Sequence, residues 1–401
     1  MSDGWKALPW KGRSLSSTLI ANRVTIMSVH LHEENAVRST TQAPVAASDM
    51  ERILDLARWA PSGDNIQPWR FTIRGEDRVL ITVTQETDIY DHNDGQATLL
   101  SAGILLESMR LAANRFGRRL EWRYLERDGL IRRIEAYLPR DSSVAEDSLC
   151  EYITIRSVNR RPYRTQRLTG EQKDMLTKSL GGELSIHWYE SFAERWRTAQ
   201  LNALSSDIRL RLRSAYEVHR RIVDWENRFS PTAIPAEAIG LDPMTLKSMR
   251  WMMGDWKRLA FMNRMPGATA VPQLEMDLLP GIKCAAHFTV DRRDRPQPGD
   301  EAESLLRAGM AIQRFWLTAT KLGLSMQPAL AAINFAIHGM TGERLRDTPA
   351  IAKKAHVLAR KLAAAEGFDP VMTLFRGRIG SAPPVAASAR SIRRPLNELI
   401  V

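Results

Sequence analysis

A short loop in the first quarter of the chain carries polar side chains suited to edging a flat heterocycle. The loop is Pro61-Ser-Gly-Asp-Asn-Ile-Gln-Pro-Trp69. Ser62, Asn65 and Gln67 can donate and accept hydrogen bonds in one plane, and Gly63 lets the backbone approach a ring closely. A purely structural turn is the competing interpretation, because Pro, Gly, Ser and Asn also favour turns.

Two groups of arginines could hold an anion. Arg156-Ser-Val-Asn-Arg-Arg-Pro-Tyr163 contains three arginines with the amide of Asn159 between them, and a second group, Arg390, Arg393 and Arg394, lies near the carboxyl end. Guanidinium groups bind phosphate through paired hydrogen bonds, so the two groups could converge on one phosphate. An exposed charge cluster is the alternative.

Familiar catalytic motifs are absent from the sequence. It contains no G-x-S-x-G elbow, no H-E-x-x-H, no Walker loop and no G-x-G-x-x-G fingerprint. We therefore expect no catalytic side chain that acts as an acid or a nucleophile. His30, His32 and Glu33 have no distant partner for a metal, so we expect no metal site.

Composition sets further limits. Of 401 residues, 44% are hydrophobic and 26% are charged, which suits a folded protein with a real core. The net charge is +11, but basic and acidic residues are interleaved, so we expect no nucleic-acid partner. No apolar run is long enough to cross a membrane. Cys150 and Cys284 are the only cysteines, which fits a reducing compartment, and we expect a cytoplasmic protein.

The polar segments need helices and strands to position them. Ser48-x-x-Glu51 and Thr169-x-x-Gln172 are capping boxes, each of which should open a short helix. A strand-like segment follows each helix, at 69–73 and at 184–188. Between helix and strand the first copy has the polar loop, whereas the second has only Gly181-Gly182.

The sequence contains an internal repeat with an offset of 206 residues. Ala97-Thr-Leu-Leu-Ser-Ala-Gly103 aligns with Glu303-Ser-Leu-Leu-Arg-Ala-Gly309, and Gly117 and Gly323 then end two long apolar helices. The pattern predicts two α+β units, 46–150 and 151–401, that form a pseudo-dimer within one chain. Such a chain would be a monomer or a weak homo-oligomer.

Two segments fall outside the repeat. Residues 1–45 are polar and weakly periodic, so we expect a flexible or extended segment, and Met27 could be the biological start. Residues 205–280 form a Trp- and Met-rich insertion in the second unit. Met249, Met252, Met253 and Trp256 share one helical face, which indicates core packing; a lid over a ligand is the alternative.

Residues 57–71, Ala-Arg-Trp-Ala-Pro-Ser-Gly-Asp-Asn-Ile-Gln-Pro-Trp-Arg-Phe, resemble the signature of the flavin-dependent nitroreductase family. Three later segments are similar to the same family in the same order: Arg156 to Tyr163, Leu322-Gly-Leu-Ser-Met-Gln-Pro328, and Arg393-Arg-Pro-Leu396. The two-copy length most resembles the two-domain, Acg-type branch. The resemblance implies a nitroreductase-like α+β fold, duplicated in one chain as an internal pseudo-dimer, with a helical, lid-like insertion.

The resemblance also implies non-covalent FMN, one per chain. Arg156, Arg160, Arg393 and Arg394 would hold the phosphate, with Asn159 nearby. The flavin would be edged by Pro61, Ser62, Gly63, Asn65 and Gln67, and faced by the backbone of Ser325, Met326 and Gln327. Only a degenerate Arg38-Ser39 stands where the first copy would carry its arginine motif, so the second site should be vestigial.

Three functions are compatible with these features. The first is an FMN-dependent oxidoreductase that uses NAD(P)H, as a transient co-substrate, to reduce a small and unidentified molecule such as a nitroaromatic or a quinone. The second is a protein that binds and sequesters FMN with little turnover. A basic nucleic-acid binder ranks last. Anaerobic bleaching of the yellow flavin by NAD(P)H would separate the first two.

Overall fold

The computed structural model describes residues 47–93, 95–265, 267–383 and 389–401. The expectations for residues 1–45, including the degenerate Arg38-Ser39 motif and the His30, His32 and Glu33 group, lie outside these ranges. Within them, no helix is long and apolar enough to cross a membrane, and no group of three His, Cys, Asp or Glu side chains could hold a metal ion.

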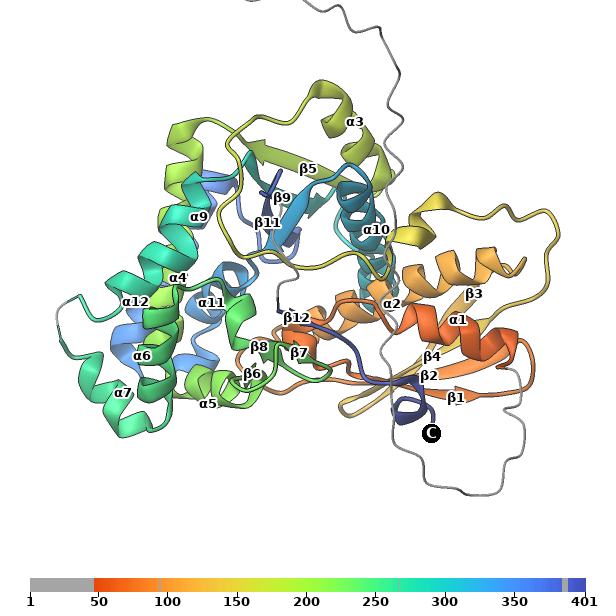
Figure 1. Ribbon diagram of the computed structural model, residues 1–401, viewed down its shortest axis with the longest axis horizontal. Helices are drawn as coiled ribbons and strands as arrows, with labels where there is room; N and C mark the ends of the chain where they lie inside the picture. Colours follow the sequence, from red (N-terminus) through yellow and green to blue (C-terminus); the bar gives the residue numbers. More distant parts are fainter. Residues whose placement is uncertain (1–46, 94, 266, 384–388) are drawn as a thin grey trace, which may run out of the picture. The chain divides into compact units, whose positions relative to one another are not determined.

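Two four-stranded antiparallel sheets have the same strand order (Figure 1). The first contains, in spatial order, β1 (Trp69–Ile73), β2 (Arg78–Thr84), β4 (Ile131–Tyr137) and β3 (Glu121–Asp128). The second contains β5 (Leu184–Tyr189), β9 (Ala286–Arg292), β11 (Thr373–Gly380) and β10 (Ser325–Pro328). The predicted α+β class with a duplicated unit is confirmed.

The capping boxes form as predicted. Ser48 accepts from the backbone of Glu51, whose side chain returns to Ser48, at the start of α1 (Asp49–Ala57). Thr169 and Gln172 do the same for α3 (Gly170–Ser179). Each helix leads into the first strand of its sheet, so the local sequence alone places the start of each repeat.

The repeated glycines lie where the two long helices cross. These are α2 (Gln96–Arg115) and α10 (Glu301–Lys321). A Cβ atom on Gly103 would lie 2.1 Å from the Leu306 carbonyl oxygen, and one on Gly309 would lie 2.3 Å from the Leu100 oxygen. In the repeat, position 100 corresponds to 306 and position 103 to 309. The two contacts are therefore equivalent and related by exchange of the helices, as at an isologous interface.

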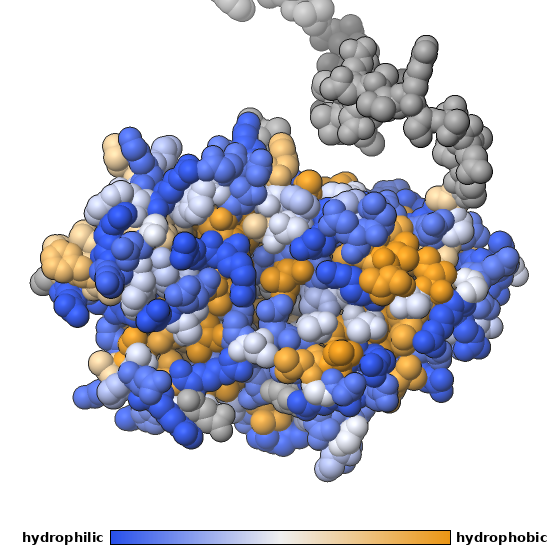
Figure 2. Space-filling model, turned by 90° about the horizontal axis from the view of Figure 1, so that it is seen from below, coloured by the Kyte–Doolittle hydropathy of each residue, from blue (hydrophilic) through white to orange (hydrophobic). Residues whose placement is uncertain are grey.

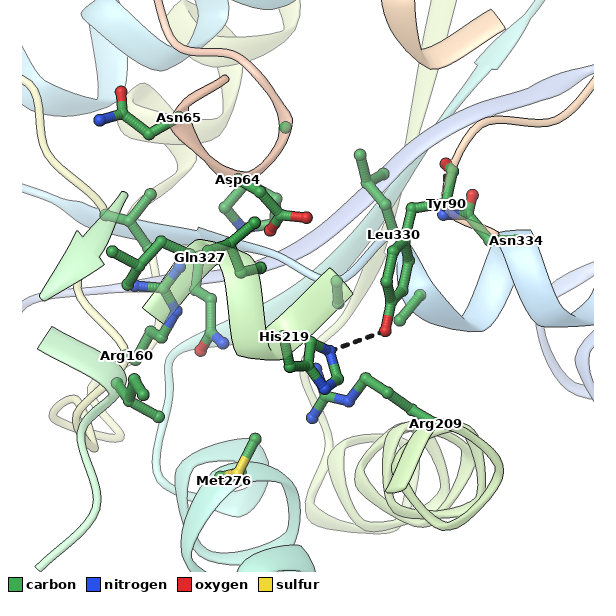
Figure 3. Close-up of a pocket in the computed structure, with 18 of the residues that line it drawn as sticks. Asp64, Asn65, Tyr90, Arg160, Arg209, His219, Met276, Gln327, Leu330 and Asn334 are labelled. Atoms are coloured by element: carbon green, nitrogen blue, oxygen red, sulfur yellow. Dashed lines mark hydrogen bonds between the residues drawn. The ribbon is translucent and has the colours of Figure 1, made fainter. Parts of the chain in front are cut away.

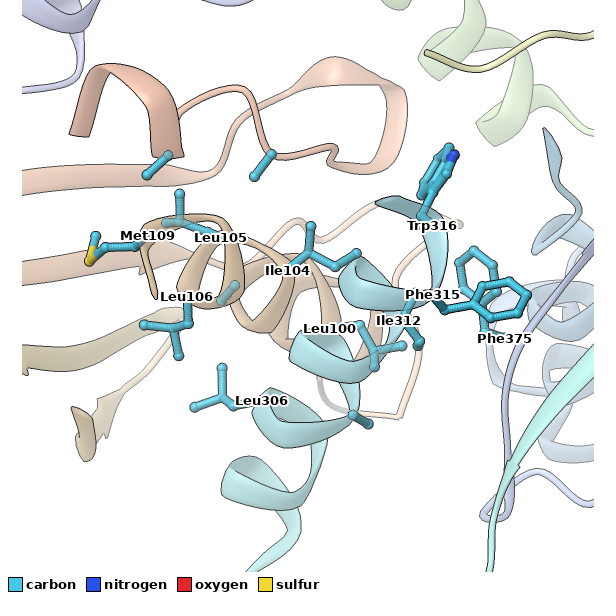
Figure 4. Close-up of a cluster of buried hydrophobic side chains, with 14 of the residues drawn as sticks. Leu100, Ile104, Leu105, Leu106, Met109, Leu306, Ile312, Phe315, Trp316 and Phe375 are labelled. Atoms are coloured by element: carbon cyan, nitrogen blue, oxygen red, sulfur yellow. The ribbon is translucent and has the colours of Figure 1, made fainter. Parts of the chain in front are cut away.

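Polar contacts continue this reciprocal pattern along the same helices. Arg314 Nη1 donates to Glu107 Oε1 at 3.0 Å, and Gln313 Nε2 donates to Ser108 Oγ at 2.9 Å. Around them one apolar core joins both helices to both sheets (Figure 4). It includes Leu105, Leu106 and Met109 from α2 and Leu306 and Phe315 from α10, all with 0% exposure.

The second unit contains two helical insertions. Between β5 and β9 the chain forms α4 (Phe192–Arg211), α5 (Arg213–Ile222), α6 (Pro243–Met253), α7 (Trp256–Met262), α8 (Ala270–Gln273), a π-helical turn (Leu274–Leu278) and α9 (Leu279–Ile282). Asp242 caps α6 and Pro243 is its first residue, as the sequence predicted. Between β10 and β11 lie α11 (Ala331–Thr341) and α12 (Pro349–Glu366), which the sequence analysis did not anticipate.

The carboxyl-terminal tail returns to the first sheet. The backbone N–H of Phe71 in β1 donates to the Leu399 carbonyl at 2.8 Å, and that of Val401 donates to Phe71 at 2.9 Å. Before this contact, β12 (Arg390–Ser391) pairs in parallel with β7 (Phe229–Ser230) of the insertion. The tail therefore carries its arginines past residues of both units.

The surface of one face is shown in Figure 2. Hydrophilic residues cover most of this face, and apolar residues occur in separate groups between them.

Candidate flavin-binding cavity

A cavity of about 450 Å³ opens between the two units and the first insertion (Figure 3). Small-molecule sites commonly enclose roughly 300–1,000 Å³, so the volume lies within the range of such sites. Its walls come from the polar loop after α1, from α2 and α10, from α4 to the π-helical turn, from β10 and from the tail. Segments far apart in the sequence thus converge on one space.

Eight of the thirteen residues expected at a flavin site line this cavity. They are Pro61, Ser62, Gly63, Asn65, Arg156, Arg160, Gln327 and Arg393. The other five are not among its lining residues: Gln67, Asn159, Ser325, Met326 and Arg394.

The polar loop has an unusual backbone. Asp64, Asn65 and Gln67 have φ angles of 49°, 63° and 51°, in the left-handed region that costs most residues free energy. Hydrogen bonds hold this conformation. The Gln67 amide donates to Asn65 O at 2.9 Å and to Pro231 O at 2.7 Å, and its oxygen accepts from the Arg394 backbone at 2.9 Å.

The Asn65 amide also joins the loop to other segments. Its Nδ2 lies 3.1 Å from the Ile392 carbonyl, 3.3 Å from that of Ala233 and 3.4 Å from that of Ser230. Asn65 and Gln67 therefore fasten the loop to the insertion and to the tail. In this structure their amides act as positioning groups.

Three arginines occupy one part of the cavity wall, and we call them the Arg156 cluster: Arg156 and Arg393, which are buried, and Arg390, which is half-buried. Burial lowers the pKa of Arg156 well below its ordinary value, and repulsion by Arg393 and Arg390 lowers this pKa further. Burial, with repulsion from Arg390 and Arg58, lowers the pKa of Arg393 to about 9. Each cation destabilises its neighbours in the absence of an anion.

The contacts of the Arg156 cluster leave donors unused. Arg390 Nη2 donates to Thr154 O and Arg393 Nε to Ala60 O, both at 2.9 Å, while the Arg156 guanidinium lies 4.5 Å from the Trp316 ring centre. Within the described part of the chain, the Nε atoms of Arg156 and Arg390 are buried without a hydrogen-bond partner. Among the described residues, no carboxylate forms a salt bridge with any of the three. This donor set fits a phosphate.

Arg160 belongs to a different group. With Arg209 and Arg378 it forms what we call the Arg209 cluster, which lines the cavity near Asp64. Burial lowers the pKa of Arg160. The Asp64 carboxylate raises this pKa, and repulsion by the Arg209 cation lowers it. Burial also raises the pKa of Asp64 to about 6. Arg156 and Arg160, expected together on one phosphate, thus lie in separate electrostatic surroundings.

Gln327 on β10 is held by this second cluster. Arg378 Nε donates to Gln327 Oε1 at 2.7 Å, so the amide nitrogen of Gln327 remains available as a donor. Arg378 also donates to the carbonyls of Arg160 and Arg161 at 2.7 and 2.9 Å, and its guanidinium lies 4.0 Å from the Tyr163 ring centre. One arginine therefore fixes both β10 and the Arg156–Tyr163 segment.

Tyr90 and His219 were not anticipated as site residues. The Tyr90 hydroxyl and His219 Nε2 form a hydrogen bond of 2.8 Å, and both residues line the cavity (Figure 3). Burial lowers the pKa of His219 to about 3, so the imidazole is neutral at pH 7. No local sequence pattern predicts this pair, because its members lie far apart in the sequence: Tyr90 precedes α2 and His219 lies on α5. Arg378 could have been recognised as a candidate, because it is a charged residue within a strand whose residues are all buried.

The methionines of the insertion also line the cavity. Met249, Met252 and Met253 on α6 and Met276 on the π-helical turn are among its lining residues. The sequence analysis first assigned the α6 face to a core. The four residues of that predicted face do not share one helix: Met249, Met252 and Met253 line the cavity from α6, whereas Trp256 lies on α7 and packs against Tyr216, with ring centres 5.3 Å apart.

Comparison with known proteins supports a relationship to one family. The nitroreductase family model matches residues 35–92 and 251–343, which contain the polar loop and Gln327. No curated protein sequence matches. The chain is therefore similar to the nitroreductase family in two separate segments, as the sequence motifs indicated. This similarity supports an oxidoreductase.

Three solved nitroreductases show low similarity to this chain. The FMN-dependent nitroreductase NfnB from Mycobacterium smegmatis, in complex with NADPH, has 17% identity, covers 62% of this chain and 96% of its own, and gives a TM-score of 0.33. A protein from Anabaena variabilis described as a nitroreductase has 8% identity over 84% and 88%, with a TM-score of 0.42. A nitroreductase with bound FMN from Bacteroides fragilis has 12% identity over 62% and 100%, with a TM-score of 0.27.

Proposed function

We propose that the chain binds one FMN non-covalently in this cavity and is an NAD(P)H-dependent oxidoreductase of the nitroreductase type. The observation that carries the proposal is the Arg156 cluster. Three mutually repelling guanidinium groups, two of them buried and that of Arg390 half-buried, form no salt bridge with a carboxylate of the described residues, and they line the same cavity as the motif-bearing loop. A phosphate would neutralise them and accept from their free donors.

Each wall would have a defined task. The Arg156 cluster would hold the phosphate, the loop at 61–65 would edge the ring, and Gln327 would donate a hydrogen bond to the ligand from β10. The bound flavin would supply hydride chemistry, accepting from a nicotinamide and passing electrons on. Since the cofactor performs that chemistry, the chain needs to bind, orient and exclude water, and no acidic or nucleophilic side chain is required.

The first insertion favours a second candidate function, the sequestration of FMN with little turnover. Its helices cover the cavity with Met249, Met252 and Met276, and Asp207 on α4 accepts from Thr269 Oγ1 at 2.7 Å beside α8. A nicotinamide stacked on the flavin would need room under this cover. A protein that only stores FMN would not need this cover to open for a co-substrate.

Anaerobic reduction separates the two functions. The protein is loaded with FMN, freed of excess flavin, and mixed with NADH or NADPH without oxygen. Loss of the flavin absorption band within seconds to minutes supports the oxidoreductase. Flavin that stays oxidised beside NAD(P)H, yet is bleached by dithionite, supports sequestration. Protein that retains no FMN overturns both.

A further inference from the structure

The Arg209 cluster is surplus to what FMN requires. FMN carries one anionic group, its phosphate, and the Arg156 cluster already offers three cations to it. The same cavity contains three more, Arg160, Arg209 and Arg378. The carboxylates of Asp64 and Asp277 also line this region, but among the described residues neither forms a salt bridge with these arginines.

Arg209 and Arg160 each donate one side-chain hydrogen bond to the described residues, fewer than Arg378. Arg160 Nη1 donates to Ala238 O at 3.2 Å, and Arg378 is fixed by Gln327 and by two carbonyls. Among the described residues the Arg209 guanidinium has one hydrogen bond, from Nη2 to Ser206 Oγ at 3.0 Å, and its buried Nε has no partner, as is also true of Arg378 Nη1. It extends from α4 toward His219 (Figure 3). A buried donor without an acceptor destabilises the protein, and an anionic ligand would relieve this cost.

The surroundings of Arg209 define what kind of anion would fit. Met276 from the π-helical turn and Leu330 before α11 face the same space (Figure 3). Thioether and aliphatic groups pack well against flat rings. The Tyr90–His219 pair adds a neutral polar edge, because burial keeps the imidazole uncharged at pH 7. Met276 and Leu330, together with the Arg209 guanidinium, suit a flat apolar molecule with one carboxylate.

We propose that Arg209 anchors the carboxylate of a flat, apolar substrate, with Met276 and Leu330 against its ring and the Tyr90–His219 pair at its edge. This inference rests on the proposed function, since it names the class of molecule that the flavin would reduce. It assigns the two arginine clusters to two different anions: the Arg156 cluster to the cofactor phosphate and Arg209 to the substrate carboxylate.

Benzoate and its neutral counterpart benzamide test the assignment. Each is titrated by calorimetry into FMN-loaded protein at pH 7.5. Benzoate should bind to the unaltered chain, and Arg209→Gln should weaken it at least tenfold. Arg209→Lys should retain part of the affinity, because an ammonium keeps the charge but loses the planar fork. Benzamide should bind weakly to all forms.

Arg197→Gln is the matched control, since Arg197 is an exposed arginine on the same helix. It should leave benzoate affinity unchanged. Benzoate that fails to bind, or that binds equally to the unaltered chain and to Arg209→Gln, overturns the assignment. Flavin content is measured separately and decides the proposed function. If the chain retains no FMN, the same titrations on flavin-free protein still decide whether Arg209 binds carboxylates.

Discussion

Arg156 illustrates a residue whose role in binding conflicts with its role in stability. Its charge is buried among Arg390 and Arg393, which lowers its pKa, and its main protein contact is the face of Trp316. Such a cation destabilises the empty protein and would become favourable only with an anion present. The cluster is therefore better explained by a ligand than by folding.

Arg156→Met should separate these two effects. Loss of a charged hydrogen bond to phosphate costs about 1.5–3 kcal/mol, so FMN affinity should fall by at least about tenfold. The flavin-free variant should melt at the same temperature as the unaltered chain or higher, because a buried unpaired charge is gone. Fluorescence titration with FMN and thermal melts of both forms provide the measurements.

Arg52→Met is the control for this prediction, since Arg52 is exposed on α1. It should change neither FMN affinity nor melting temperature. An Arg156→Met protein that binds FMN as tightly as the unaltered chain would remove Arg156 from the phosphate site.

Asp64 should make the flavin-free protein sensitive to pH. Burial, with repulsion from Asp88, raises its pKa from 3.8 to about 6. The folded state therefore binds a proton more tightly than the unfolded chain, so this contribution to stability is present below about pH 4 and is lost as the pH rises to about 6. Because Asp64 lines a cavity that water can enter, we expect about 1–3 kcal/mol rather than a larger effect.

Asp64→Asn tests this expectation. Asparagine tolerates the left-handed conformation of this position, so the backbone should be kept. Urea unfolding of flavin-free protein should show the variant gaining about 1–3 kcal/mol on the unaltered chain between pH 4 and pH 7. A difference in stability that does not change with pH would show that Asp64 titrates normally.

Among the secondary structure elements, the crossing of α2 and α10 is the most constrained contact. The helices approach through Gly103 and Gly309, where any side chain would meet backbone atoms of the other helix. Backbone cannot move aside as a flexible side chain can, so the crossing distance depends on both glycines.

Gly103→Ala should destabilise the protein by about 3 kcal/mol or more, because the new methyl group would lie 2.1 Å from the Leu306 carbonyl oxygen. Gly182→Ala, where nothing lies within 4 Å of the added carbon, is the control and should have little effect. Urea denaturation measures both. A tolerated Gly103→Ala would mean that the helices can separate without cost.

A second contact between elements holds the cover of the cavity in place. Asp207 on α4 accepts from Arg211 Nε and Thr269 Oγ1, both at 2.7 Å, and from Lys354 on α12. Hydrogen bonds from these partners keep its pKa below the ordinary value although burial opposes this. One carboxylate thus joins α4, α12 and the segment that begins α8.

Asp207→Ala should loosen this cover. We expect FMN to dissociate about tenfold faster and the α7–α8 segment to become more sensitive to protease, since several charge-assisted bonds are lost together. Asp174→Ala, an exposed carboxylate on α3, is the control. Unchanged flavin release from Asp207→Ala would show that the cover is held by its apolar contacts alone.

The sequence predicted local structure better than it predicted the site. Capping boxes at Ser48 and Thr169 and the glycines at 117 and 323 form as expected, because each depends on neighbouring residues. Which arginine of the tail faces the cavity could not be predicted, since a tail residue's direction depends on its partner strand. Arg390 pairs with Phe229 and lines the cavity, whereas Arg394 reaches Glu398 outside it.

The site residues that could not be predicted from the sequence depend on contacts between segments far apart in the chain. Tyr90 and His219 are 129 positions apart and share no motif, so only the folded chain brings them together. The second insertion, α11 and α12, was overlooked because it lies inside the repeat and carries no unusual composition.

For the whole molecule, the main feature is that its two duplicated units carry different binding segments. Both units have the same strand order, and their long helices cross reciprocally. The polar loop occurs only in the first unit, while the Arg156–Tyr163 segment and the tail belong to the second. A chain of this kind should therefore build one flavin site, where two identical subunits would build two.

The number of flavins per chain tests this account most directly. FMN-saturated protein is freed of unbound flavin, denatured, and analysed for released flavin and for protein concentration, with the native mass measured by light scattering. The account predicts one FMN for each 401-residue chain, whatever the oligomeric state. Two FMN per chain, or protein that retains none at saturating FMN, would contradict it.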